Sequence, residues 1–197
     1  MKVYELKDPQ NLRLRAHPWV DSDGDPSHRY HDLRRHPDRI RTRIEDLLPW
    51  REEAAVETFL QLLEWLNGPE SALESNDCAF SGPGVNAGPH SDLRLEVSGR
   101  LMILFRDQRR NTVSGQVEAL TQHVAYALSL ADPGLQAAVI GASVVDVQFV
   151  ELPGPAVKQR GKQLLLSFWA WGDDEAEAYR NLNRTLKCLG GALRTTS

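Results

Sequence analysis

Three stretches in the second half of the chain alternate between hydrophobic and polar residues, which is the period of a β-strand. Between and after them, apolar residues recur at the spacing of an amphipathic helix. The predicted strands cover residues 93–105, 139–150 and 162–171. The predicted helices run from Ser114 to Leu130 and from Asp173 or Asp174 onward.

These elements follow one another in the order β-α-β-β-α, so an α+β sandwich is predicted for the second half of the chain. The crossover helix makes the first two strands parallel, and the turn after the second strand makes the third antiparallel to it. This is the order of a ferredoxin-like split unit that lacks its last strand. A fourth strand could come from residues 2–6 or from residues near Cys78.

Helical spacing also appears in the first half of the chain. One helix begins near Pro37 and another near Arg51, and Asn67-Gly68-Pro69 ends the second. We predict a single domain over residues 1–197, in which the helical N-terminal portion packs on the sandwich. Its extension (1–92) carries the helix pair and a long loop, and the β-α-β-β-α unit covers residues 93–197.

The run from Gly68 to Asp92 shows no period and is predicted to be a loop. Compact domains seldom keep so long a loop unless it binds, reacts or is disordered. Its glycines do not form a phosphate-binding loop, because no lysine follows them and the next element is a strand. Cys78 has Asp77 beside it and His90 later in the loop, so these three are the catalytic candidates for a nucleophile with a base. The alternative is that Cys78 is only a small residue at the loop entry or in a short edge strand.

The third predicted strand is apolar on both sides, with Phe168 facing one way and Trp169 and Trp171 the other. On the tryptophan side we also place Met102, Leu104, Val144, Asp146 and Gln148. Burying such a face is worth several kcal/mol, so we expect the N-terminal helices, a second subunit, or a ligand or partner protein to cover it. Polar groups among aromatic rings suit specific recognition. The predicted binding residues are therefore Trp169, Trp171, Asp146 and Gln148.

Composition limits the class of partner. The net charge is −4 and the only concentrated basic stretch, residues 31–43, is interspersed with acids, which argues against general nucleic-acid binding. No apolar run reaches the length of about eighteen residues that suggests a membrane span. The start of the chain lacks the apolar core of a secretory signal, which predicts a cytoplasmic protein. Two cysteines are too few for a disulfide framework or a structural zinc site.

Two polar clusters are candidate metal sites. Asp21, Asp23, Asp25 and Asp32 match part of a calcium-loop template, but Pro26 stands where that loop needs glycine. His28, His31 and His36 lie close together, but arginines crowd the same stretch and repel a cation. We therefore predict neither a metal nor a cofactor. The acids of WAWGDDEAEAY are interpreted as caps of the last helix, and the alternatives are that they act as acid and base or bind a cationic group.

The sequence favours a non-enzymatic binding protein of a bacterial-type cytosol, which recognises a protein partner in a toxin-neutralising or regulatory role. A homodimer would use the same apolar face. The alternative is a small metal-independent enzyme that uses the loop at residues 76–90, with Cys78 and His90. The two readings differ in whether Cys78 and a histidine ring lie within hydrogen-bond reach.

Overall fold

The computed structural model describes residues 1–5, 15–17, 32–150 and 159–196. Its strands are β1 (Lys2–Glu5), β2 (Arg15–His17), β3 (Leu73–Val85), β4 (Leu95–Phe105), β5 (Ala138–Phe149) and β6 (Gln159–Gly172). Its α-helices are α1 (Ile40–Arg43), α2 (Ala54–Asn67), α3 (Gln116–Ala131) and α4 (Glu175–Arg194). Short 3-10 segments are η1 (Pro37–Arg39), η2 (Glu45–Trp50) and η3 (Gln108–Thr112). The α+β class predicted from the sequence is confirmed.

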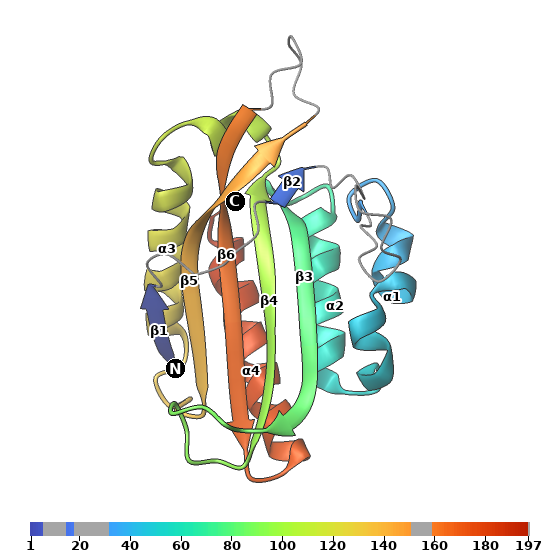
Figure 1. Ribbon diagram of the computed structural model, residues 1–197, viewed down its shortest axis with the longest axis vertical. Helices are drawn as coiled ribbons and strands as arrows, with labels where there is room; N and C mark the ends of the chain where they lie inside the picture. The colour runs from blue at the N-terminus through green and yellow to red at the C-terminus, as the bar shows by residue number, and fades with distance from the viewer. Residues whose placement is uncertain (6–14, 18–31, 151–158, 197) are drawn as a thin grey trace.

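The strands form one mixed sheet in the order β1-β5-β6-β4-β3, and β2 pairs with β5 as well (Figure 1). β6 is antiparallel to both of its neighbours, β4 and β5, and β3 is antiparallel to β4. β4 and β5 therefore run in the same direction on either side of β6. The two short N-terminal strands, β1 and β2, both run parallel to β5 and pair with different stretches of it.

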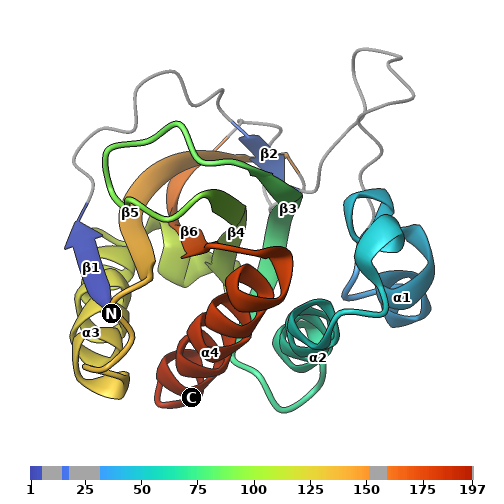
Figure 2. The ribbon, with the colours of Figure 1, turned by 90° about the horizontal axis from the view of Figure 1, so that it is seen from below.

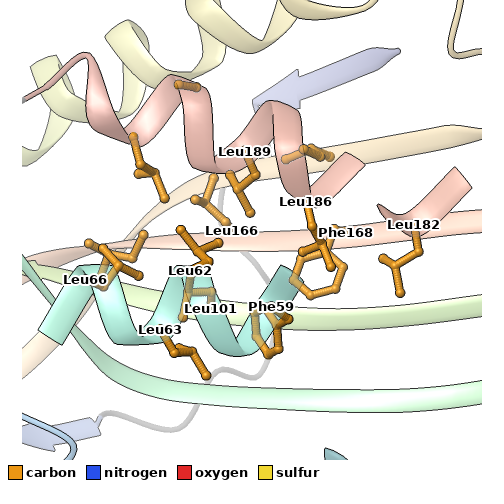
Figure 3. Close-up of a cluster of buried hydrophobic side chains, with 14 of the residues drawn as sticks. Phe59, Leu62, Leu63, Leu66, Leu101, Leu166, Phe168, Leu182, Leu186 and Leu189 are labelled. Carbon is orange, nitrogen blue, oxygen red and sulfur yellow. The ribbon is translucent and has the colours of Figure 1, made fainter. Parts of the chain in front are cut away.

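The helices α2, α3 and α4 lie on one face of the sheet (Figure 2). The main core fills the space between them and the strands, and Figure 3 shows its centre, where leucines and phenylalanines of α2 and α4 meet those of β4 and β6. The rings of Phe59 and Phe168 meet edge to face, with their centroids 5.6 Å apart. The apolar faces of the helices and the apolar side of the strands thus pack together into a single layer.

α1 and α2 do not cover the tryptophan side of the sheet, so the expectation that the N-terminal helices would cover it is wrong. α2 packs beside α4, where the Thr58 hydroxyl donates to Asn183 Oδ1 at 2.7 Å. The apolar stripe of α2, including Phe59 and Leu63, belongs to the same core as α4. We call the opposite side of the sheet, which carries Leu165 and Trp169, the far face; Figure 1 looks onto it, with α4 behind the strands.

The stretch predicted as a long loop is mostly β3, an edge strand 13 residues long. Leu73 and Ser75 face the helices, but the register shifts between Ser75 and Asp77, so that Cys78 and Phe80 continue on that side. Such a bulge inserts one extra residue and breaks the period of two. A second shift follows between Ser81 and Gly84. The strand therefore carries no regular alternation in its sequence.

The predicted side assignment of β5 is also wrong. Val144 pairs with Leu164, which lies in the main core, so Asp146 and Gln148 share the helix side of the sheet with it. The far face instead receives Val145, Val147 and Phe149. Alternation separates the two sides of one strand, but it does not say which side adjoins which side of the next strand.

Gly99 on β4 is required by the close approach of Phe168. A Cβ atom there would lie 2.5 Å from Phe168 Cζ and 2.7 Å from the carbonyl oxygen of Ala79. We expect Gly99→Ala to lower the free energy of unfolding by about 2 kcal/mol, the usual cost of overpacking. Urea denaturation measures the change. Gly84→Ala is the matched control, because nothing lies within 4 Å of a Cβ at that position; equal effects of the two substitutions would contradict the steric argument.

Candidate binding face

One end of the far face carries an aromatic group that we call the tryptophan zone (Tyr4, His90, Ser98, Trp169 and Trp171). Trp169 lies between Val139 and Ser98 of the neighbouring strands and is only partly buried. Trp171 is buried, and its indole Nε1 donates to Glu96 Oε2 at 2.9 Å. Trp171 is thus part of the packed interior, whereas part of the Trp169 side chain is accessible to solvent.

Tyr4 and His90 bring two further rings to this zone from distant parts of the chain. The His90 ring lies 6.5 Å from the ring centroid of Trp171 and 6.5 Å from that of Tyr4. Tyr4 is 43% exposed and His90 is exposed. The connection between β3 and β4 therefore folds over this end of the far face and widens its aromatic surface.

The middle of the far face is polar and charged. Arg100 and Ser167 face each other across β4 and β6, and both are partly buried. Arg100 Nη2 lies 3.3 Å from Asp77 Oδ2, so the aspartate proposed as a catalytic partner is paired with an arginine. An aromatic ring beside serines and an arginine offers both apolar contact and hydrogen-bonding groups.

The other end of the far face holds a buried polar cluster, the His17 network (His17, Arg34, Glu74, Asn76 and Gln163). His17 Nδ1 lies 2.8 Å from Asn76 Oδ1, and His17 Nε2 lies 3.3 Å from Glu74 Oε1. Asn76 Nδ2 donates to Gln163 Oε1 at 2.8 Å. Both ring nitrogens of His17 therefore lie close to side-chain oxygens of β3.

Arg34 completes this network from outside. Its Nη1 donates to Glu74 Oε2 at 2.9 Å, while 46% of its side chain is exposed and Glu74 is buried. The bulge at Asn76 is what aims the amide at His17 and Gln163. The network joins β2, β3 and β6, and its residues carry no signal in the sequence, because they come from segments far apart in the chain. Sequence reasoning missed it entirely.

The structure does not bring the catalytic candidates together. Cys78 packs against the main core on the helix side of the sheet. His90 lies over Trp171 on the far face, so the sheet separates it from the thiol. The predicted binding residues are likewise divided, since Asp146 points to the helix side and pairs with Lys162 at 2.7 Å.

The predicted metal clusters fall mostly outside the described residues, to which Asp21, Asp23, Asp25, His28 and His31 do not belong. Within them, Asp32 Oδ1 accepts from the backbone N–H of Arg35, and His36 is exposed. In the part of the chain that the structure describes, no group of three or more His, Cys, Asp or Glu side chains is placed to hold a metal ion.

Arginines of the basic stretch at residues 31–43 bind carboxylates of the same chain. Arg41 donates to Glu57 and Glu64, and the hydrogen bonds from these two raise the pKa of Arg41. Arg34 is held by Glu74 in the same way. These contacts fit the interpretation of a solvated helical surface.

None of the described helices is both long enough and apolar enough to cross a membrane. No protein-family model, curated protein or solved structure was found to match this chain.

Proposed function

We propose that this protein is a non-enzymatic binding protein and that the tryptophan zone of its far face contacts a protein partner. The observation that carries the proposal is Trp169, which stays partly accessible on a sheet face that none of the described helices covers. Tyr4 and His90 extend the surface, and Arg100 borders it. Tryptophan, tyrosine and arginine are the side chains that contribute most often to binding energy at protein interfaces.

A partner of different sequence fits this zone better than a second copy of the chain. Obligate homodimer interfaces are strongly apolar, whereas Trp169 is flanked here by serines and a charged pair. The net charge of −4 favours a protein partner over nucleic acid. Within this proposal the role is regulatory or toxin-neutralising, and the compartment is the cytoplasm.

We further propose that the sheet is a variant of the ferredoxin-like split unit within a single domain. The strand that such a unit places beside its first strand would here be β3, which pairs antiparallel with β4. β3 comes from the N-terminal half of the chain, so the order of the elements along the sequence differs from that of the standard unit.

The proposal is tested by placing a photo-crosslinking residue at position 169 in the cells that make this protein. We expect it to capture one defined protein, and the same residue at the exposed position of Tyr126 on α3 to capture none. Light scattering of the purified protein shows whether a second copy is the partner instead. A dimer that Trp169→Ala dissociates would overturn the proposal of a different partner.

Trp169→Ala is expected to weaken binding of that purified partner by about tenfold or more, corresponding to about 1.4 kcal/mol or more. Isothermal titration calorimetry measures the affinity, and urea denaturation checks that the variant is folded. Tyr126→Ala is the control, because it removes an exposed aromatic ring from another surface. An unchanged affinity for Trp169→Ala would rule out the tryptophan zone as the contact.

A further inference from the structure

A second group of aromatic and acidic residues lies where α2 and α4 both begin, at the end of the molecule seen in Figure 2. Trp50 ends η2, and its ring centroid lies 6.3 Å from that of Tyr179 on α4. The Trp50 ring packs directly on Gly82 of β3, so closely that a Cβ atom at Gly82 would lie 2.3 Å from the ring. We call Trp50, Glu53, Glu175 and Tyr179 the Trp50 corner.

Tyr179 is the unusual member of this corner. Only 4% of it is exposed, and its hydroxyl is buried without a hydrogen-bond partner among the residues that the structure describes. Buried hydroxyls in native proteins are nearly always hydrogen-bonded, because an unpaired one costs free energy. A buried hydroxyl that stays unpaired at the edge of an acidic group is a position that a ligand can satisfy.

Glu53 precedes α2 and Glu175 begins α4, and the charges of both carboxylates act on Tyr179. Burial raises the pKa of Tyr179, and the negative charges of Glu53 and Glu175 raise it further. Among the described residues, neither Glu53 nor Glu175 forms an ion pair or a side-chain hydrogen bond. The neighbouring Arg51 forms an ion pair with Glu52, with 3.3 Å between Arg51 Nε and Glu52 Oε1.

The other acids at the start of α4 have structural roles. Asp174 accepts from the backbone N–H of Glu177, and Glu177 in turn accepts from the backbone N–H of Asp173. These contacts cap the helix, as the sequence predicts for this stretch. Glu175, also in the first turn, takes no part in capping. It lies four residues before Tyr179 and therefore on the same side of α4.

We propose that the Trp50 corner binds an ammonium or guanidinium group. Glu53 and Glu175 supply the opposite charge, the Tyr179 hydroxyl accepts a hydrogen bond from the ligand N–H, and the Trp50 ring offers a cation–π contact. The hydroxyl is buried, so the side chains around it have to move aside as the ligand enters. The group belongs either to a lysine or arginine of another protein or to a small free amine. This site does not depend on the tryptophan zone.

The test is an NMR titration of the full chain with two probes, the blocked tripeptide acetyl-Gly-Arg-Gly-amide and 1,4-diaminobutane. We expect the indole N–H signal of Trp50 to shift and saturate with at least one of them. Tighter binding of the tripeptide identifies a protein side chain as the natural ligand, and tighter binding of the diamine identifies a small amine. If neither probe shifts the Trp50 signal, the proposal is overturned.

Variants separate the site from general charge effects. The double variant Glu53→Gln/Glu175→Gln is expected to bind the tighter-binding probe with about tenfold lower affinity, because both negative charges are lost. Glu70→Gln, at an exposed position beyond the other end of α2, neutralises one carboxylate away from the corner and should leave binding unaltered. Binding by the double variant equal to that of the unaltered chain would also overturn the proposal.

Tyr179→Phe removes only the hydroxyl. It is expected to lower the affinity for the probe. The melting temperature should stay the same or rise, because the substitution removes an unpaired buried hydroxyl. A purely structural role for Tyr179 would lower the melting temperature instead. Trp169→Ala should leave the probe titration unchanged, so a failure here is distinct from a failure of the proposed partner surface.

Discussion

Replacing Phe168 with alanine is expected to lower the free energy of unfolding by about 4 kcal/mol. Phe168 is fully buried at the centre of the layer between the sheet and the helices, against Phe59 on α2 and beneath Gly99 on β4. Alanine would leave a cavity bounded by two strands and a helix, which cannot collapse without moving all three. Urea denaturation followed by far-UV circular dichroism measures the loss.

The control for Phe168 is Tyr126→Ala on α3, which removes an aromatic ring that is 68% exposed. Exposed substitutions of this kind usually change stability by less than about 0.5 kcal/mol. If both variants lost similar stability, the placement of Phe168 at the centre of the core would be wrong.

Glu74→Ala is expected to lower the free energy of unfolding by about 3 kcal/mol, because it removes the buried carboxylate that accepts the charged hydrogen bond from Arg34 and contacts His17. Glu74 is 2% exposed and lies within 3.3 Å of His17 and 2.9 Å of Arg34. Arg34 can turn to water, but His17 is buried and would lose the carboxylate that lies 3.3 Å from its Nε2. The same denaturation measurement gives the change.

A double-mutant cycle assigns this effect to the pair. His17→Ala combined with Glu74→Ala should cost less than the two single changes added together, by about 1 kcal/mol or more. Asp146→Ala removes a carboxylate whose pair with Lys162 is exposed, and it should cost less than about 1 kcal/mol. Strict additivity of His17→Ala and Glu74→Ala would show that the two side chains do not interact.

Where the chemical pattern was regular, the sequence was a good guide to the fold. The period of two in β4 and β6 and the period of the apolar residues in α2, α3 and α4 reflect burial on one side, so all five elements were predicted close to their bounds. β3 was predicted mainly as a loop, with a short strand near Cys78 only as an alternative, because its bulge at Asn76 moves the inward positions from odd to even numbers within one strand.

The site was harder to predict than the fold. Trp169 and Trp171 were correctly placed opposite Phe168, since their alternation lies within one strand. Asp146 was placed wrongly because its side depends on pairing between strands. His17 and Asn76 meet through contacts between residues 59 positions apart, which no local period records.

The pairing of β1 and β2 with β5 has a consequence for how the molecule avoids self-assembly. β5 is 12 residues long, and its outer edge is paired by β1 at Lys2–Glu5 and by β2 at Arg15–His17. An unpaired strand edge of that length is a template onto which another chain can add. Proteolytic loss of the first 17 residues would therefore leave the outer edge of β5 unpaired. Such truncation should promote oligomers in which a strand of another chain pairs with β5.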